Sequence, residues 1–196
     1  AKTKDFVTAV DEHSIILVKE LREKETADEI DRIAKTIEET LNAETNSRVY
    51  ISSGTIVSDL KDVSRSYKEA KMALEVGKIF ETDKYIVNYE KLGIGRLIYQ
   101  LPLPLCRMFI KEVLHGLTMD DFDDETLATV NKFFENNLNV SETSRQLYIH
   151  RNTLVYRLDK LQKMTGLDLR NFDDAIIFKI TLMVSKYMIY MDKMAY

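Results

Sequence analysis

The stretch that decides the fold of the C-terminal half is Asn139–Leu158, NVSETSRQLYIHRNTLVYRL. Its pattern predicts a short helix over 141–147, a three-residue turn over 148–150 and a longer helix over 151–164. Ile149 is the apolar side chain of the turn, and we expect it to be buried between the two helices. A short helix, a tight turn and a longer helix are together typical of the helix-turn-helix unit.

The apolar residues of the longer helix lie on one side. Leu154, Leu158 and Leu161 follow the i, i+4, i+7 spacing of a single inward stripe. In the shorter helix, Ser141 stands where an N-cap is expected, and Thr143 is a small residue at a point where two helices cross closely. We therefore expect the two helices to pack tightly through these positions.

The opposite side of the longer helix is polar and cationic. At about 100° per residue, the side chains that point away from the leucines are those of Asn152, Tyr156, Lys160 and Lys163, flanked by Arg151 and Arg157. Four Lys or Arg and one acid, Asp159, lie between His150 and Met164, so this segment carries +3 (four minus one) within a chain of formal net charge −4. Amide, phenol and cationic groups are those that reach base edges and phosphates of duplex DNA.

The remainder of the C-terminal half is also helical. The four helices expected there lie at about 124–136, 141–147, 151–164 and 174–191. Pro104 suits the first turn of an earlier helix that ends near Leu114. The last helix is apolar around much of its circumference, and its predicted main stripe is Ile176, Ile180, Val184, Tyr187 and Met191. Burial on several sides and contact with a second copy of the chain both explain such a helix.

The N-terminal half alternates short apolar runs with helical patterns. Runs at 6–10 and 14–21 flank the polar tripeptide Asp11-Glu12-His13, which predicts a β-hairpin. The later features are a capping box of Thr26 with Glu29, a strand over 48–53, a helix capped by Ser58 or Asp59 that ends near Gly77, and a strand over 85–87. The order β-β-α-β-α-β is most of a ferredoxin-like α+β sandwich without its leading β-α unit. We therefore expect the chain to be truncated at its N-terminus.

Composition and apolar patterning limit which classes of protein this chain can belong to. Of the 196 residues, 45% are hydrophobic and 31% are charged, which is enough apolar content to bury a core. The N-terminus lacks a signal-peptide core, and the apolar stretch Ile176–Met191 is shorter than the roughly 20 residues that span a bilayer. Cys106 is the single cysteine, so no intrachain disulfide is expected. These features predict a cytoplasmic protein with no membrane association.

The segment 139–170, NVSETSRQLYIHRNTLVYRLDKLQKMTGLDLR, closely resembles the C-terminal DNA-binding domain of the PucR and carbohydrate-diacid-regulator (CdaR) family of bacterial transcription regulators. IHRNTLVYRL carries most of the resemblance. Upstream, 54–80, GTIVSDLKDVSRSYKEAKMALEVGKIF, is similar to the family's GGDEF-like domain. The resemblance implies an α+β fold, in which an incomplete ferredoxin-like (GGDEF-like) sandwich is followed by an all-α Fis-type helix-turn-helix domain. The predicted segments are the GGDEF-like domain over 1–92, a helical connector over 93–120 and the DNA-binding domain over 121–196.

The resemblance also implies a function and partners. The longer helix is expected to enter the major groove, with Asn152, Thr153 and Tyr156 nearest the bases and Arg151, Arg157 and Lys160 at phosphates. Ser141, Thr143 and His150 complete the predicted DNA-binding set, with His150 serving as an N-cap, a phosphate contact or both. A homodimer that reads two half-sites of a promoter is expected, and so is a small-molecule effector that binds outside this fragment.

Two other functions are open on the sequence alone. A nucleotide-processing enzyme on the cyclase-like domain is one, but the hairpin tip Val10-Asp11-Glu12-His13 lacks the paired glycines of active diguanylate cyclases. A pure oligomerisation module is the other. Gly93-Ile94-Gly95 is interpreted as a hinge, because Ile98 stands where a dinucleotide-binding loop needs a third glycine. The sequence thus predicts a regulator with no catalytic residues, no metal site and no cofactor.

Overall fold

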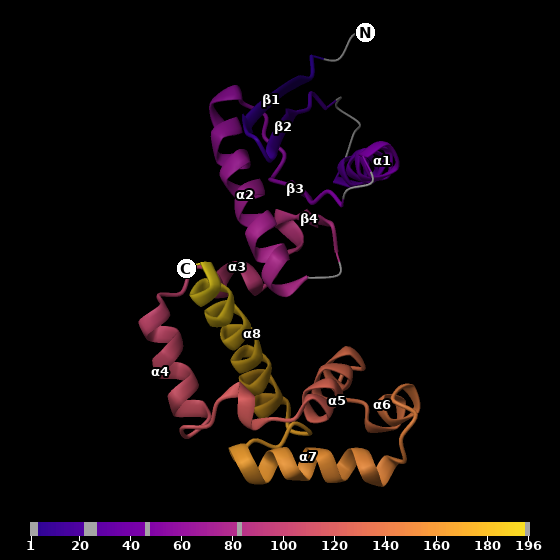
Figure 1. The fold of residues 1–196 in the computed structure, drawn as a ribbon, viewed down its shortest axis with the longest axis vertical. Coiled ribbons are helices and arrows are strands. Elements are labelled where there is room, and N and C mark those ends of the chain that lie inside the picture. Colours follow the sequence, from indigo (N-terminus) through magenta and orange to yellow (C-terminus); the bar gives the residue numbers. More distant parts are fainter. Residues whose placement is uncertain (1–3, 22–26, 46–47, 82–83, 195–196) are drawn as a thin grey trace. The chain divides into compact units, whose positions relative to one another are not determined.

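The computed structural model describes residues 4–21, 27–45, 48–81 and 84–194, and Figure 1 shows their ribbon. The chain forms two compact units. The first comprises Ala1–Leu74 and Asp83–Lys91, and the second comprises Glu75–Thr82 and Leu92–Tyr196. All described strands belong to the first unit, whereas the second unit is helical.

The first unit has the element order that the sequence predicts. Its elements are β1 (Phe6–Asp11), β2 (Ser14–Val18), α1 (Ala27–Thr45), β3 (Ile51–Ser53), the 3₁₀ turn η1 (Leu60–Asp62), α2 (Val63–Phe80) as far as Leu74, β4 (Ile86–Asn88) and the 3₁₀ turn η2 (Tyr89–Lys91). The order β-β-α-β-α-β and the α+β class are confirmed. The cap expected at Thr26 lies outside the described residues.

Strand pairing in this unit differs from the single sheet of a ferredoxin-like sandwich. β1 and β2 form an antiparallel hairpin with Phe6 opposite Val18, and β3 pairs with β4 in parallel with Ile51 opposite Ile86. Across the described ranges these are two separate two-stranded sheets. Alternation of apolar and polar residues predicts that a segment forms a strand. It does not predict which strand pairs with it, because pairing is set by contacts between residues distant in the sequence.

The C-terminal part of α2 shows a second difference. α2 runs through Gly77 to Phe80, so the prediction that it ends near Gly77 is wrong. Glycine inside a helix costs about 1 kcal/mol, and burial of Val76 and Ile79 on either side offsets this cost. The predicted side-chain cap is also wrong, because Asp59 precedes η1 and makes no side-chain cap hydrogen bond.

The second unit contains the helices that the sequence predicts and two short elements that it does not, a four-residue helix and a 3₁₀ turn. They are α3 (Gly95–Ile98), α4 (Leu103–Val113), the 3₁₀ turn η3 (Met119–Asp121), α5 (Asp124–Glu135), α6 (Val140–Gln146), α7 (Arg151–Thr165) and α8 (Phe172–Met194). Pro104 lies in the first turn of α4, as predicted. Gly95 permits a close approach of α3 to α2. A side chain at this position would place its Cβ 3.1 Å from both Phe80 and Val76, which is tighter than ordinary van der Waals contact. No described helix is both long enough and apolar enough to span a membrane.

Two hydrophobic cores hold the second unit together, and α8 contributes to both. The first core contains Leu114, Phe122, Val130, Phe133, Leu154, Leu158, Leu161, Leu169, Phe178 and Leu182. The second contains Ile79, Ile98, Cys106, Val184 and Tyr187, with Met183, Met188 and Met191 packed against it. Burial of α8 on several sides is confirmed. Its predicted stripe is wrong at Ile176, which is 41% exposed, because α8 presents different faces to the two cores.

Candidate nucleic-acid interface

Side-chain caps fix the start of both helices around the turn. α6 begins after Asn139, whose Oδ1 accepts a hydrogen bond from the Glu142 N–H at 3.0 Å. The prediction of Ser141 as the N-cap is therefore wrong, and Ser141 lies in the first turn of α6 with its side chain exposed. α7 begins after His150, whose Nδ1 accepts from the Asn152 N–H at 3.2 Å. The capping role of His150 is confirmed.

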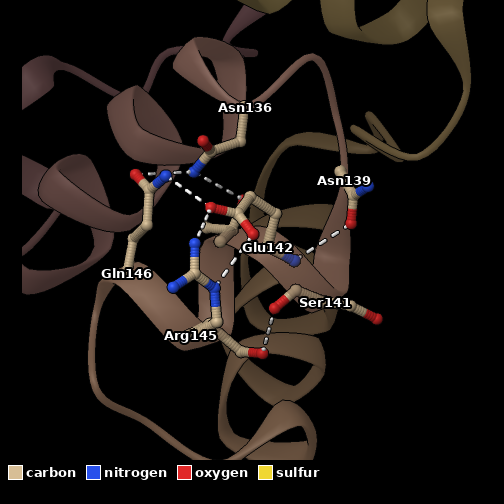
Figure 2. Close-up of polar contacts among 8 residues, drawn as sticks. Asn136, Asn139, Ser141, Glu142, Arg145 and Gln146 are labelled. Carbon is tan, nitrogen blue, oxygen red and sulfur yellow. Dashed lines mark hydrogen bonds and ion pairs between the residues drawn. The ribbon is translucent and has the colours of Figure 1, made fainter.

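A polar network joins the end of α5 to α6 (Figure 2). The Asn136 amide donates to Thr143 Oγ1 at 3.4 Å and to Gln146 Oε1 at 3.3 Å. Glu142 accepts from Arg145 Nη2 and from Gln146 Nε2, both at 2.6 Å. These hydrogen bonds, the one from Arg145 foremost, lower the pKa of the Glu142 carboxyl. The network orients α6 against α5, so its members are scaffold residues in this structure.

Thr143 lies inside this scaffold. Its side chain is 0% exposed, and the neighbouring Ser144 is also buried, with its hydroxyl donating to the Ser141 carbonyl at 3.0 Å. Their burial is consistent with the close helix crossing that the sequence predicts. A side chain without exposed surface cannot reach DNA, so Thr143 serves the packing of α6 and the prediction of Thr143 as a DNA-binding residue is wrong.

The two faces of α7 differ completely in character. Leu154, Leu158 and Leu161 are buried in the first core, which confirms the predicted stripe. The exposed side chains of α7 include Arg151, Asn152, Thr153, Tyr156, Lys160 and Lys163, with Tyr156 68% exposed. Figure 1 shows α7 at the edge of the helical unit, with α5 and α6 on one of its sides. The unit therefore presents a polar, cationic helix face to solvent.

Arg157 is the exception among the cations of α7. Its side chain is only 14% exposed, and its guanidinium forms an ion pair with Glu125 and donates to Thr129 Oγ1 at 2.9 Å. Thr129 is itself buried, and its hydroxyl donates to the Glu125 carbonyl at 2.7 Å. Arg157 thus connects α7 to the first two turns of α5. In this structure it positions the helix instead of extending outward.

Lys160 is also paired, but at the surface. Its Nζ lies 2.7 Å from Asp123 Oδ2, and both side chains are about half exposed. Asp123 is at the same time the N-cap of α5, because its Oδ1 accepts from the Thr126 N–H at 2.7 Å. The hydrogen bond from Lys160, followed by those from Thr126, holds the pKa of Asp123 well below its usual range. Asp123 therefore caps α5 and pairs with Lys160 of α7 at the same time.

The connection from α7 to α8 is held by residues that the sequence analysis missed. The Arg170 guanidinium contacts three side chains: Nη1 lies 2.9 Å from Asp159 Oδ1, Nε lies 2.7 Å from Asp168 Oδ1, and Nη2 donates to Gln162 Oε1 at 3.0 Å. Gly166 ends α7 in the left-handed conformation at φ 79°. Since such pairs join separate turns of the chain, periodicity carries no signal for them. No group of three or more potential metal-ligating side chains occurs in the ranges that the structure describes.

Comparisons with known proteins bear on both halves of the chain. Residues 126–184 match the family described as the PucR C-terminal helix-turn-helix domain, and residues 1–76 match the GGDEF-like domain. The first match covers α5 to α7 and half of α8, the same helices that bury the leucine stripe. The chain therefore contains a GGDEF-like domain and a PucR-type helix-turn-helix domain. Its GGDEF-like and PucR-type helix-turn-helix domains follow one another in the order that the sequence predicts.

Several curated relatives of this chain are named as regulators. The Purine catabolism regulatory protein of Bacillus subtilis is 28% identical over 132 residues, which cover 67% of this chain and 25% of the relative. The Carbohydrate diacid regulator of Escherichia coli is 31% identical over 139 residues, 71% of this chain and 36% of the relative. The DNA-binding transcriptional activator AdeR of B. subtilis is 33% identical over 132 residues, 63% and 30% respectively. The chain thus spans about a quarter to a third of the length of these relatives.

Proposed function

We propose that this chain is a sequence-specific DNA-binding transcription regulator that reads the major groove with α7. The observation that carries the proposal is the division of α7 into a leucine face buried in the first core and a polar, cationic face open to solvent. A recognition helix needs both properties, since it must be held rigidly by its domain while it presents donors to the DNA. The transcription regulators among the relatives support the same conclusion.

The proposed roles follow from exposure along α7. Asn152, Thr153 and Tyr156 face base edges, where amide, hydroxyl and phenol groups discriminate between base pairs. Arg151 and Lys160 contact phosphates, together with Ser141 at the start of α6 and the Nε2 side of His150. Arg157 takes part as a positioning residue, because its guanidinium is committed to Glu125 and Thr129.

Lys160 provides the test. The Lys160→Ala variant is expected to bind all duplexes more weakly and to lose about one unit of slope in a plot of log affinity against log salt. Lys111→Ala is the control, because Lys111 is an exposed lysine that lies on α4 and outside the polar face of α7. It should change neither affinity nor slope. If the two variants behave alike, the phosphate contact is wrong, and if the unmodified chain binds no duplex at low salt, the proposed function is wrong.

We further propose a homodimer, in which two small helix-turn-helix domains would contact two half-sites and so double the contacts with DNA. The methionines of α8 that lie near its C-terminal half, Met183, Met188 and Met191, are partly buried against the second core and do not support the dimer. The support comes from the earlier helix with Pro104 in its first turn, α4, whose Leu105 and Met108 are both exposed about one turn apart. The proposed effector is a small molecule that binds outside this chain. Because chromosomal DNA is the proposed target, the proposed location is the cytoplasm.

We propose that the GGDEF-like domain has no cyclase activity of its own. Ala9 and Val10 occupy the positions where the family resemblance would put the glycines of an active hairpin. The tip is a polar turn in which the His13 N–H donates to Asp11 Oδ1 at 2.8 Å. The hydrogen bond from the His13 N–H, followed by that from the Ser14 side chain, lowers the pKa of Asp11, so the carboxylate serves the turn itself.

A further inference from the structure

Tyr148, in the turn between α6 and α7, combines two unfavourable properties. Its backbone is left-handed at φ 55°, a conformation that costs most residues other than glycine free energy. Its side chain is 95% exposed, the highest exposure among the large hydrophobic residues of the described chain. A bulky aromatic residue therefore occupies a position where glycine would be easier to accommodate.

Tyr148 makes few contacts within the protein that would offset this cost. Tyr148 makes one backbone hydrogen bond, from its N–H to the Arg145 carbonyl at 3.2 Å, which glycine would make equally well. Its neighbour Ile149 anchors the turn by packing against the first core. Within the described ranges, the Tyr148 ring and hydroxyl have no side-chain partner.

The place of Tyr148 in the chain indicates what its side chain meets. It stands two residues before His150, the cap of α7, and four before Asn152, so it belongs to the end of α7 where the proposed recognition face begins. At such an end, a turn side chain lies where the DNA backbone passes the recognition helix. Tyrosine is among the side chains that bond phosphate oxygens, and its ring can lie against the deoxyribose.

We propose that Tyr148 is a DNA-backbone contact, with its hydroxyl on a phosphate and its ring against the adjoining sugar. This inference rests on the proposed DNA-binding function and adds a residue to it. The contact is uncharged, so it strengthens binding without releasing an additional counterion. It also explains why a residue that strains the free protein occupies the turn.

The test is Tyr148→Gly, measured for both thermal stability and affinity. The probe is a duplex of about 30 base pairs, roughly three helical turns, at low salt. Relief of the left-handed strain should raise Tm by about 2 °C or more, whereas affinity should fall about tenfold at an unchanged salt slope. Tyr148→Phe should retain part of the affinity, because it removes only the hydroxyl.

His115→Gly is the matched control. His115 is also exposed and left-handed, at φ 51°, but it follows α4 and not the helix-turn-helix turn. It should gain stability and keep its affinity. If Tyr148→Gly also keeps its affinity while the unmodified chain binds the duplex, this inference is overturned and the proposed function stands. If the unmodified chain does not bind, both are overturned.

Discussion

At the scale of single residues, a cation on the polar side of α7 need not be exposed to solvent. Arg157 and Arg151 lie on the same helix with the same charge, yet Arg157 is 14% exposed and Arg151 is exposed. The periodicity of α7 places Arg157 at the flank of its polar face, and only the position of Glu125, 32 residues earlier, reveals its partner. The sequence predicts the cation but not the pairing, because the pairing depends on how α5 packs against α7.

This difference predicts that the same conservative change lowers stability at Arg157 and leaves it unchanged at Arg151. Arg157→Lys should destabilise the fold by about 1–3 kcal/mol, since lysine lacks the planar fork that reaches both Glu125 and Thr129. Thermal unfolding should show a Tm lower by several degrees. Arg151→Lys is the control and should leave Tm unchanged. Equal Tm values for the two variants would mean that the bridge from α7 to α5 contributes nothing.

At the scale of elements, local patterns predict helices well and their ends less well. The boundaries of α5, α6 and α7 agree with the predicted ranges because an apolar stripe is a local property of the sequence. The cap of α6 was misplaced because Asn139 and Ser141 are both good capping residues, and only the backbone selects between them. The stripe of α8 was misplaced for a different reason: the helix packs against two cores on different faces.

The start of α5 gives a prediction of pH dependence. Asp123 has a lowered pKa in the folded state, so its contribution to stability is present above the unfolded pKa of about 3.9 and is lost as pH falls towards the folded value. Asp123→Asn keeps the cap but loses the ion pair with Lys160. The variant should have the lower Tm at neutral pH, and the gap should close as pH falls below about 4. A gap that stays constant across this range would exclude the pair as its cause.

At the scale of the whole molecule, the proposed dimer depends on which apolar side chains are exposed, and the sequence shows this only indirectly. The domain bounds predicted at 1–92, 93–120 and 121–196 stay predictions. The structure sorts apolar residues into buried and exposed, which periodicity alone could not do for Met188 and Leu105. The exposed pair Leu105 and Met108 is therefore the surface on which the proposed dimer depends.

Sedimentation checks the dimer. The unmodified chain should sediment as a dimer at tens of micromolar, and Leu105→Glu with Met108→Glu should sediment as a folded monomer, because charge is costly in an apolar contact. Met108→Leu is the conservative control and should remain dimeric. A dimer that survives the double substitution uses another surface, and a monomeric unmodified chain contradicts the proposal.

The most direct test of the central claim is a selection of binding sites from random duplexes, performed with the unmodified chain and with Asn152→Ala. The claim is that the exposed face of α7 reads sequence, and Asn152 lies at its first turn. The unmodified chain should select a defined motif. Asn152→Ala should select one that is relaxed at one or two adjacent positions, since losing a good base contact costs about 1–3 kcal/mol of discrimination. An identical motif from both proteins, or no motif from either, would contradict the account.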